Sequence, residues 1–174
     1  MGLTRAPEPP AAAIGAPSTV DDLAAEDPFV RRRAALAIRP DPTTMGRLIA
    51  HLPRETDRTV RETLLTTIAA HGTADDASAL VDLLDTDDAG LRVAIVDALG
   101  EMRGVAHLVV TRLMADEDAD RRCLAVMVLA MLHHPDVPGW LADLVDRDPD
   151  ANVVAAAIGE LAEVGGPEHA SVIE

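Results

Sequence analysis

The sequence predicts an all-α fold, a right-handed α-solenoid of about five helical hairpins, and two observations carry this prediction. First, an aspartate precedes an apolar run at helical spacing five times, and the anchor residues three positions later are 30, 31, 30 and 32 apart. Second, the chain lacks the apolar–polar alternation of half-buried strands. A period near 30 without such alternation is typical of stacked helices. The five aspartates are Asp27, Asp57, Asp88, Asp118 and Asp150.

The composition agrees with closely packed helices. Of the 174 residues 48% are apolar, but Phe29 and Trp140 are the only aromatic ones and tyrosine is absent. Alanine, leucine and valine must therefore fill the interior, and such small side chains let helices approach closely. We expect Trp140 either to pack in the core or to anchor a partner.

Each repeat is predicted to be a short first helix, an acidic turn and a second helix. We expect residues 1–18, interrupted by four prolines, to be a disordered tail, and residues 19–174 to be the repeat domain. The expected first helices are 19–26, 43–52, 75–84, 105–114 and 138–145. The expected second helices are 28–38, 58–71, 89–102, 119–133 and 151–164. Residues 167–174 then begin an incomplete sixth unit.

The ends of the second helices carry capping residues. Each of the five repeated aspartates stands where an N-cap carboxylate accepts hydrogen bonds from free backbone N–H groups. Gly72, Gly104 and Gly165 follow second helices, where a left-handed residue is common. The apolar stripe of each second helix is wider than one hairpin can bury, so we expect the hairpins to stack.

The segment from Asp88 to Gly100 reads DAGLRVAIVDALG. It resembles the HEAT repeat family, specifically its phycobilisome-lyase-like branch, whose hallmark is an Asp, Val-Arg, an Ala and Ala-Leu-Gly. The second repeat keeps Asp57, Val60 and Arg61 of this pattern, and the resemblance extends over about residues 19–166. It implies an α-solenoid whose second helices line the concave face. It implies little about function, since the family includes scaffolds, lyases and assembly factors.

The charge argues against two classes of partner. The formal net charge is −15, and the chain has no lysine. An acidic surface repels phosphate backbones and anionic membranes, so we expect no nucleic-acid and no membrane partner. The composition fits either a high-salt cytoplasm or a GC-rich genome. Cys123 is the only cysteine, which excludes an intramolecular disulfide and favours a cytoplasmic location.

An arginine stands four residues after each of the first four aspartates. An acid four positions before a base is the favoured orientation for an ion pair on a helix. We therefore expect a structural ladder of charges along one side of the solenoid, with an anion-binding row of arginines as the alternative. The arginines are Arg31, Arg61, Arg92 and Arg122.

No cofactor or metal is expected. The alternating aspartates of the acidic turns lack the Gly and Glu positions of a calcium-binding EF-hand loop, and the histidines lack zinc-ligand spacing. Arg121, Arg122 and a helix N-terminus could lower the pKa of Cys123, but no catalytic base accompanies this thiol.

The surface of the second helices is the candidate binding site. From repeat to repeat its residues change from charged to apolar, and Val93, Cys123, Met127 and Met131 form a candidate apolar patch. Dimerisation and burial in the core are the alternatives to a binding site. The predicted partner-binding residues are Arg61, Glu62, Thr66, Arg92, Val93, Asp97, Arg122, Cys123 and Met127.

The predicted function is non-catalytic recognition of a protein partner on the concave face. The family branch suggests a lyase-like or cofactor-assembly chaperone as the alternative. A DNA-processing enzyme is a weaker alternative, because such enzymes need a cationic groove with aromatic residues. The incomplete last repeat suggests a homodimer.

Overall fold

The computed structural model describes residues 19–39 and 41–166, and all regular structure in this part of the chain is helical. The predicted tail and the predicted start of a sixth unit lie outside the described residues. The second helices of the five repeats are α1 Pro28–Ala37, α3 Arg58–His71, α5 Ala89–Glu101, α7 Ala119–Met131 and α9 Ala151–Val164. The first helices are η2 Val20–Ala24, α2 Pro42–His51, α4 Ala74–Asp82, α6 Ala106–Met114 and α8 Val137–Arg147, and one-turn helices η3 Leu52–Arg54 and η4 Leu83–Asp85 extend α2 and α4.

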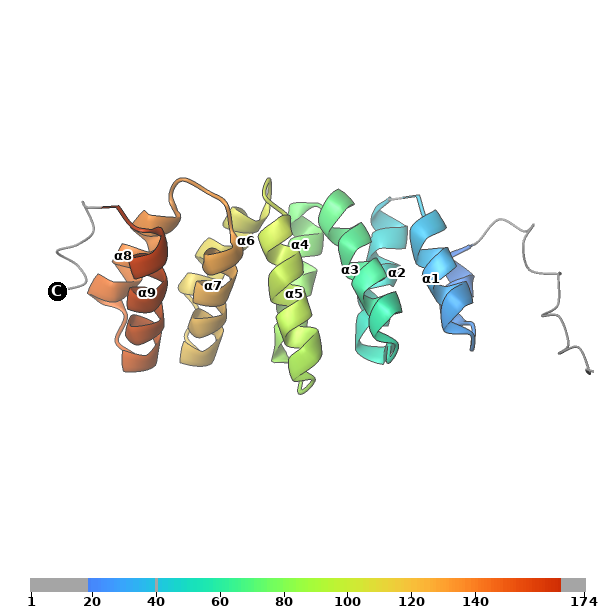
Figure 1. The fold of residues 1–174 in the computed structure, drawn as a ribbon, viewed down its shortest axis with the longest axis horizontal. Coiled ribbons are helices and arrows are strands. Elements are labelled where there is room, and N and C mark those ends of the chain that lie inside the picture. The colour runs from blue at the N-terminus through green and yellow to red at the C-terminus, as the bar shows by residue number, and fades with distance from the viewer. Residues whose placement is uncertain (1–18, 40, 167–174) are drawn as a thin grey trace, which may run out of the picture.

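The helices form two layers of an elongated row (Figure 1). In one layer each second helix packs on the next, from α1 through α9, and the first helices form the other layer. The prediction of an all-α solenoid of five hairpins is confirmed. The first helix of the first repeat is a short 3₁₀ helix, Val20–Ala24, instead of the expected residues 19–26.

One aliphatic core runs through all five repeats. Its largest fully buried side chains are leucines and isoleucines from both layers, among them Leu48, Leu64, Ile95 and Leu141. Trp140 is half-buried against this core, and its ring stacks on His134, which in turn stacks on His107. The tryptophan therefore packs at the junction of α6 and α8. Phe29, in contrast, is 68% exposed.

The five repeated aspartates are the N-caps of the second helices, and each side chain accepts a hydrogen bond from a backbone N–H of the first turn. Each such cap stabilises its helix by about 1 kcal/mol. The expectation of left-handed glycines is wrong. Gly72 and Gly165 follow their helices with φ of −69° and −74°, and Gly104 lies beyond Met102, the C-cap of α5. The chain leaves α3 and α9 in extended conformation, which requires no positive φ.

The repeated arginines do not pair with the aspartates that cap their own helices; they bind the preceding turn and, in three of four cases, the next repeat. The Arg31 Nη1 atom donates to the carbonyl oxygens of Ala25 and Glu26 at 2.9 and 2.8 Å. Its Nε and Nη2 atoms donate to both carboxylate oxygens of Glu55, each at 2.8 Å. Arg31 thus joins the turn of its own repeat to the turn of the second repeat.

Arg122 repeats this arrangement near the other end of the row. It donates to the carbonyl oxygens of Asp116 and Glu117 and, at 2.7 and 2.9 Å, to both carboxylate oxygens of Asp148. Arg61 bonds the Glu55 carbonyl oxygen and the Asp88 carboxylate, whereas Arg92 bonds the carbonyl oxygens of Leu84 and Thr86. The predicted ladder is therefore structural, but its charge pairs join successive repeats instead of residues four apart.

Candidate functional site

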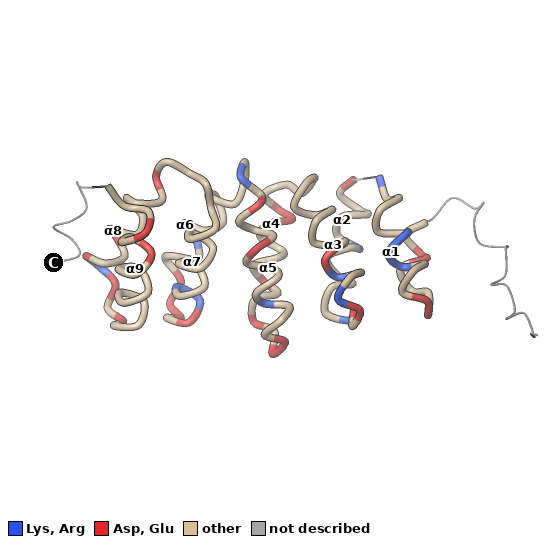
Figure 2. The backbone as a smooth tube through the Cα atoms, viewed as in Figure 1, with Lys and Arg blue, Asp and Glu red and all other residues tan. Residues whose placement is uncertain are grey.

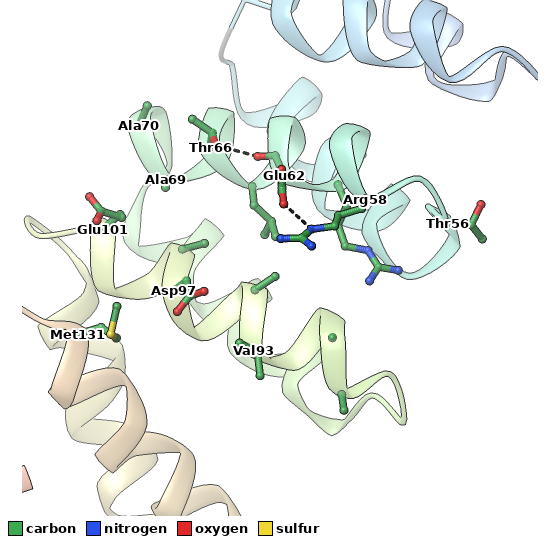
Figure 3. Close-up of a pocket in the computed structure, with 16 residues that line it drawn as sticks. Thr56, Arg58, Glu62, Thr66, Ala69, Ala70, Val93, Asp97, Glu101 and Met131 are labelled. Carbon is green, nitrogen blue, oxygen red and sulfur yellow. Dashed lines mark hydrogen bonds and ion pairs between the residues drawn. The ribbon is translucent and has the colours of Figure 1, made fainter.

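The described part of the chain has a groove of about 1090 Å³ between the second helices α3 and α5 (Figure 3). It lies on the side of the row formed by the second helices. We call it the α3/α5 groove; its lining residues are Thr56, Arg58, Arg61, Glu62, Leu65, Thr66, Ala69, Ala70, Ala89, Gly90, Val93, Ala94, Asp97, Ala98, Glu101 and Met131.

Small side chains shape the groove. Ala69, Ala94 and Ala98 line it at positions where two helices of one layer face each other, and Leu65 is buried beside them. The alanines leave an open, apolar channel because each leaves unfilled the space that a larger aliphatic side chain would occupy. A partner helix can approach such a surface closely.

Large apolar side chains stand exposed at the groove. Val93 is 50% exposed and Met131 is 45% exposed. Leu36 and Met127, which are 66% and 43% exposed, continue the same face onto α1 and α7. Isolated exposed apolar residues are common on proteins, so it is the alignment of several on one helical layer that makes this face the candidate site.

The two ends of the groove differ in charge. At the N-terminal end of α3, Arg58 pairs with Glu62 at 2.7 Å, and Arg61 pairs with Asp88 at 2.9 Å. Toward the C-terminal end of α5, Asp97 and Glu101 are exposed and make no ion pair with any residue of 19–39 or 41–166. The C-terminal ends of α3 and α5 add the negative ends of two helix dipoles. This end of the groove is therefore anionic.

The structure brings five of the nine predicted partner-binding residues together in the groove. These are Arg61, Glu62, Thr66, Val93 and Asp97. Met127 lies on the next second helix with its side chain exposed.

Arg92 and Arg122 do not lie in the groove. Their guanidinium groups bind turn carbonyls, and Arg122 is only 8% exposed, so both residues are committed to packing between helices. Cys123 is half-buried. Burial raises the pKa of its thiol, and the carboxylates of Asp150, Asp120 and Asp148 raise it further despite Arg122. The hypothesis of a lowered thiol pKa is wrong.

Glu101 and the alanines of the groove are not among the residues predicted from the sequence. Glu101 lies one helical turn after Asp97, so extending the surface stripe by one turn would have found it. The alanines gave no such signal, because their exposure depends on the spacing between α3 and α5.

Within residues 19–39 and 41–166, no three His, Cys, Asp or Glu side chains are grouped to hold a metal ion. Among the helices described, none has the length and apolar character that crossing a membrane requires.

The repeats of this chain match a known protein family. The family model for HEAT repeats matches residues 16–100 and 106–174. The chain belongs to the HEAT repeat family. HEAT repeats form helical scaffolds that often mediate protein interactions. No curated protein and no solved structure matches the chain.

Proposed function

We propose that this HEAT-repeat protein is a non-catalytic scaffold that binds a protein partner in the α3/α5 groove. The observation that carries the proposal is the exposure of Val93 and Met131 at the edge of an apolar channel. Covering such side chains is favourable by roughly 25 cal/mol per Å² of apolar surface. The groove is preformed by stacked helices, so binding orders little of the scaffold.

The chemistry of the groove favours recognition over catalysis. Its ionisable side chains are Arg58, Arg61, Glu62, Asp97 and Glu101, and no nucleophilic side chain paired with a base lies among its lining residues. Nucleophilic catalysis requires such a pair.

The test compares the full-length chain with Val93→Glu in affinity purification from the native cell. Leu108→Glu is the matched control, since Leu108 is 52% exposed on α6 of the other layer. A protein that the wild type and the control capture, and that Val93→Glu loses, supports the proposal. Circular dichroism must show that all three chains are equally helical. Identical captures by all three would refute a role for the groove.

A lyase-like or cofactor-assembly function is the second candidate, and the motif from Asp88 to Gly100 favours it through its likeness to the phycobilisome-lyase-like branch. The raised pKa of the Cys123 thiol argues against covalent chemistry there. Visible absorption by the protein purified from its native cell would support this candidate, and a colourless preparation with no bound small molecule in mass spectrometry would count against it.

A further inference from the structure

We infer that the segment bound in the α3/α5 groove is an amphipathic helix of a partner protein, and that its basic side chains pair with Asp97 and Glu101. The inference rests on the proposed function and specifies the chemistry of the partner. Three features of the groove carry it: the saturated backbone of its walls, the apolar channel, and the two unpaired carboxylates.

The walls of the groove favour a helical ligand. Both are α-helices, α3 and α5, whose interior N–H and C=O groups bond within the helix. The Thr66 hydroxyl has no hydrogen left to donate to a ligand, since it donates to the Glu62 carbonyl oxygen at 2.8 Å. An extended peptide laid in the channel would find few backbone partners and would leave its own buried polar groups unsatisfied. A helix satisfies its backbone internally and presents only side chains.

The apolar channel sets the size of that helix. The 13 residues of α5 are about 20 Å long at 1.5 Å per residue, which corresponds to three to four turns of a partner helix. Aliphatic side chains at helical spacing on one face of the partner would cover Val93 and Met131. They would enter the space above Ala94 and Ala98.

The carboxylates of Asp97 and Glu101 determine the charge expected of the partner helix. Asp97 and Glu101 are separated by one helical turn on α5, and both line the groove. Because neither has a cationic partner among the described residues, a lysine or arginine next to the apolar face of the ligand gains two acceptors without breaking an existing pair. An acidic ligand would add repulsion to a groove whose two arginines are already paired.

The experiment selects ligands from a phage-displayed library of random peptides of about 14 residues, panned on the full-length chain. Panning at about 0.3 M NaCl screens the general attraction of basic peptides to an acidic protein. We expect enriched peptides to combine apolar residues at helical spacing with lysine or arginine. A fluorescein-labelled selected peptide then reports affinity by fluorescence anisotropy.

Two variants and one control test the assignment. Val93→Glu should lower the affinity for the peptide more than about tenfold, because it places a carboxylate in the apolar contact. The double variant Asp97→Asn, Glu101→Gln should lower the affinity for the peptide about fivefold to tenfold and reduce the dependence of this affinity on salt. Asp82→Asn with Glu163→Gln makes the same charge change at exposed positions on α4 and α9, and it should leave the affinity unchanged.

The outcomes separate the two proposals. Peptides that require Val93 but carry no excess of basic residues, or that tolerate the Asp97/Glu101 variant as well as the control, would overturn the charge assignment and leave the groove as the binding site. If no selected peptide depends on Val93, the proposed function fails as well. A concentration-dependent dimer in sedimentation that Val93→Glu dissociates would assign the groove to a second copy of the chain and overturn the inference.

Discussion

Glu55 is buried between the first two repeats, where a lone carboxylate would be costly. It is 1% exposed and accepts from the Arg31 guanidinium, the Asp57 backbone N–H and the His51 ring. Burial alone raises the pKa of Glu55, but the hydrogen bonds from Arg31, Asp57 and His51 outweigh it and lower the pKa to about 2. The side chain therefore remains ionised across the range in which most carboxylates protonate.

This shift predicts a loss of stability in acid. The pKa of Glu55 is lowered from 4.5 to about 2, so the folded state binds its proton less readily than the unfolded state. The stabilisation is complete above about pH 4.5 and is lost as the pH falls toward 2, by at most about 3 kcal/mol. Urea unfolding at pH 7, 4 and 3 should show a smaller decrease for Glu55→Gln than for the wild type. Equal decreases in both chains would contradict this assignment.

Gly100 is the last residue of the Ala-Leu-Gly motif, and its lack of a side chain lets α5 approach α7. A Cβ atom there would lie 2.5 Å from the Met131 Cβ and 3.3 Å from its carbonyl carbon and oxygen. We expect Gly100→Ala to lower the free energy of unfolding by about 1–3 kcal/mol, because α7 must shift.

Gly159 of α9 is the matched control, since a Cβ there meets nothing within 4 Å. Gly159→Ala should stabilise the protein by up to about 1 kcal/mol through helix propensity. Chemical denaturation followed by circular dichroism measures both variants. Similar effects at the two positions would show that close packing at Gly100 is unimportant.

At the scale of single elements, the junction between the fourth and fifth repeats depends on Arg122. Its guanidinium joins two turn carbonyls to the Asp148 carboxylate, and the side chains of this pair are 9% and 3% exposed. Lysine cannot form the paired contact or reach all of these acceptors at once. We expect Arg122→Lys to cost about 2–3 kcal/mol of unfolding free energy.

Arg147→Lys is the comparison for this prediction. Arg147 pairs with Asp143 four residues earlier, but its side chain is 78% exposed. Its replacement should change the unfolding free energy by less than about 0.5 kcal/mol. If Arg122→Lys also left the unfolding free energy nearly unchanged, the ion pair would be dispensable for the junction.

Features set by neighbouring residues were predicted correctly from the sequence, whereas contacts between repeats were not. The second helices were predicted to within a few residues, because their N-caps and apolar spacing are local signals. The arginine partners were mispredicted, because Glu55 lies 24 residues from Arg31 and Asp148 lies 26 residues from Arg122. Such pairs depend on how successive repeats stack. Val93 and Asp97 of the groove were predicted from the surface stripe, whereas its alanines depend on the distance between two helices.

At the scale of the whole molecule, acidic residues are spread over every repeat (Figure 2), and the formal net charge is −15. Most of them face water, so their mutual repulsion is reduced by salt. The pairs of Arg31 with Glu55 and Arg122 with Asp148 are largely buried, so salt screens them less.

We therefore expect the melting temperature to rise by a few degrees between about 10 and 200 mM NaCl at pH 7. Choline chloride at the same ionic strength is the control for a specific sodium effect and should give the same rise. A melting temperature that falls with added salt would mean that exposed ion pairs outweigh the repulsion.

The contact between Gly100 and Met131 reaches beyond the core, since Met131 also forms part of the edge of the groove. The position of this edge of the groove therefore depends on the absence of a side chain at Gly100. A larger side chain at position 100 would displace Met131 and so change the mouth of the channel, although residue 100 itself does not line the groove. If the groove binds a helix as proposed, substitutions at position 100 are expected to change its ligand preference from behind the contact surface.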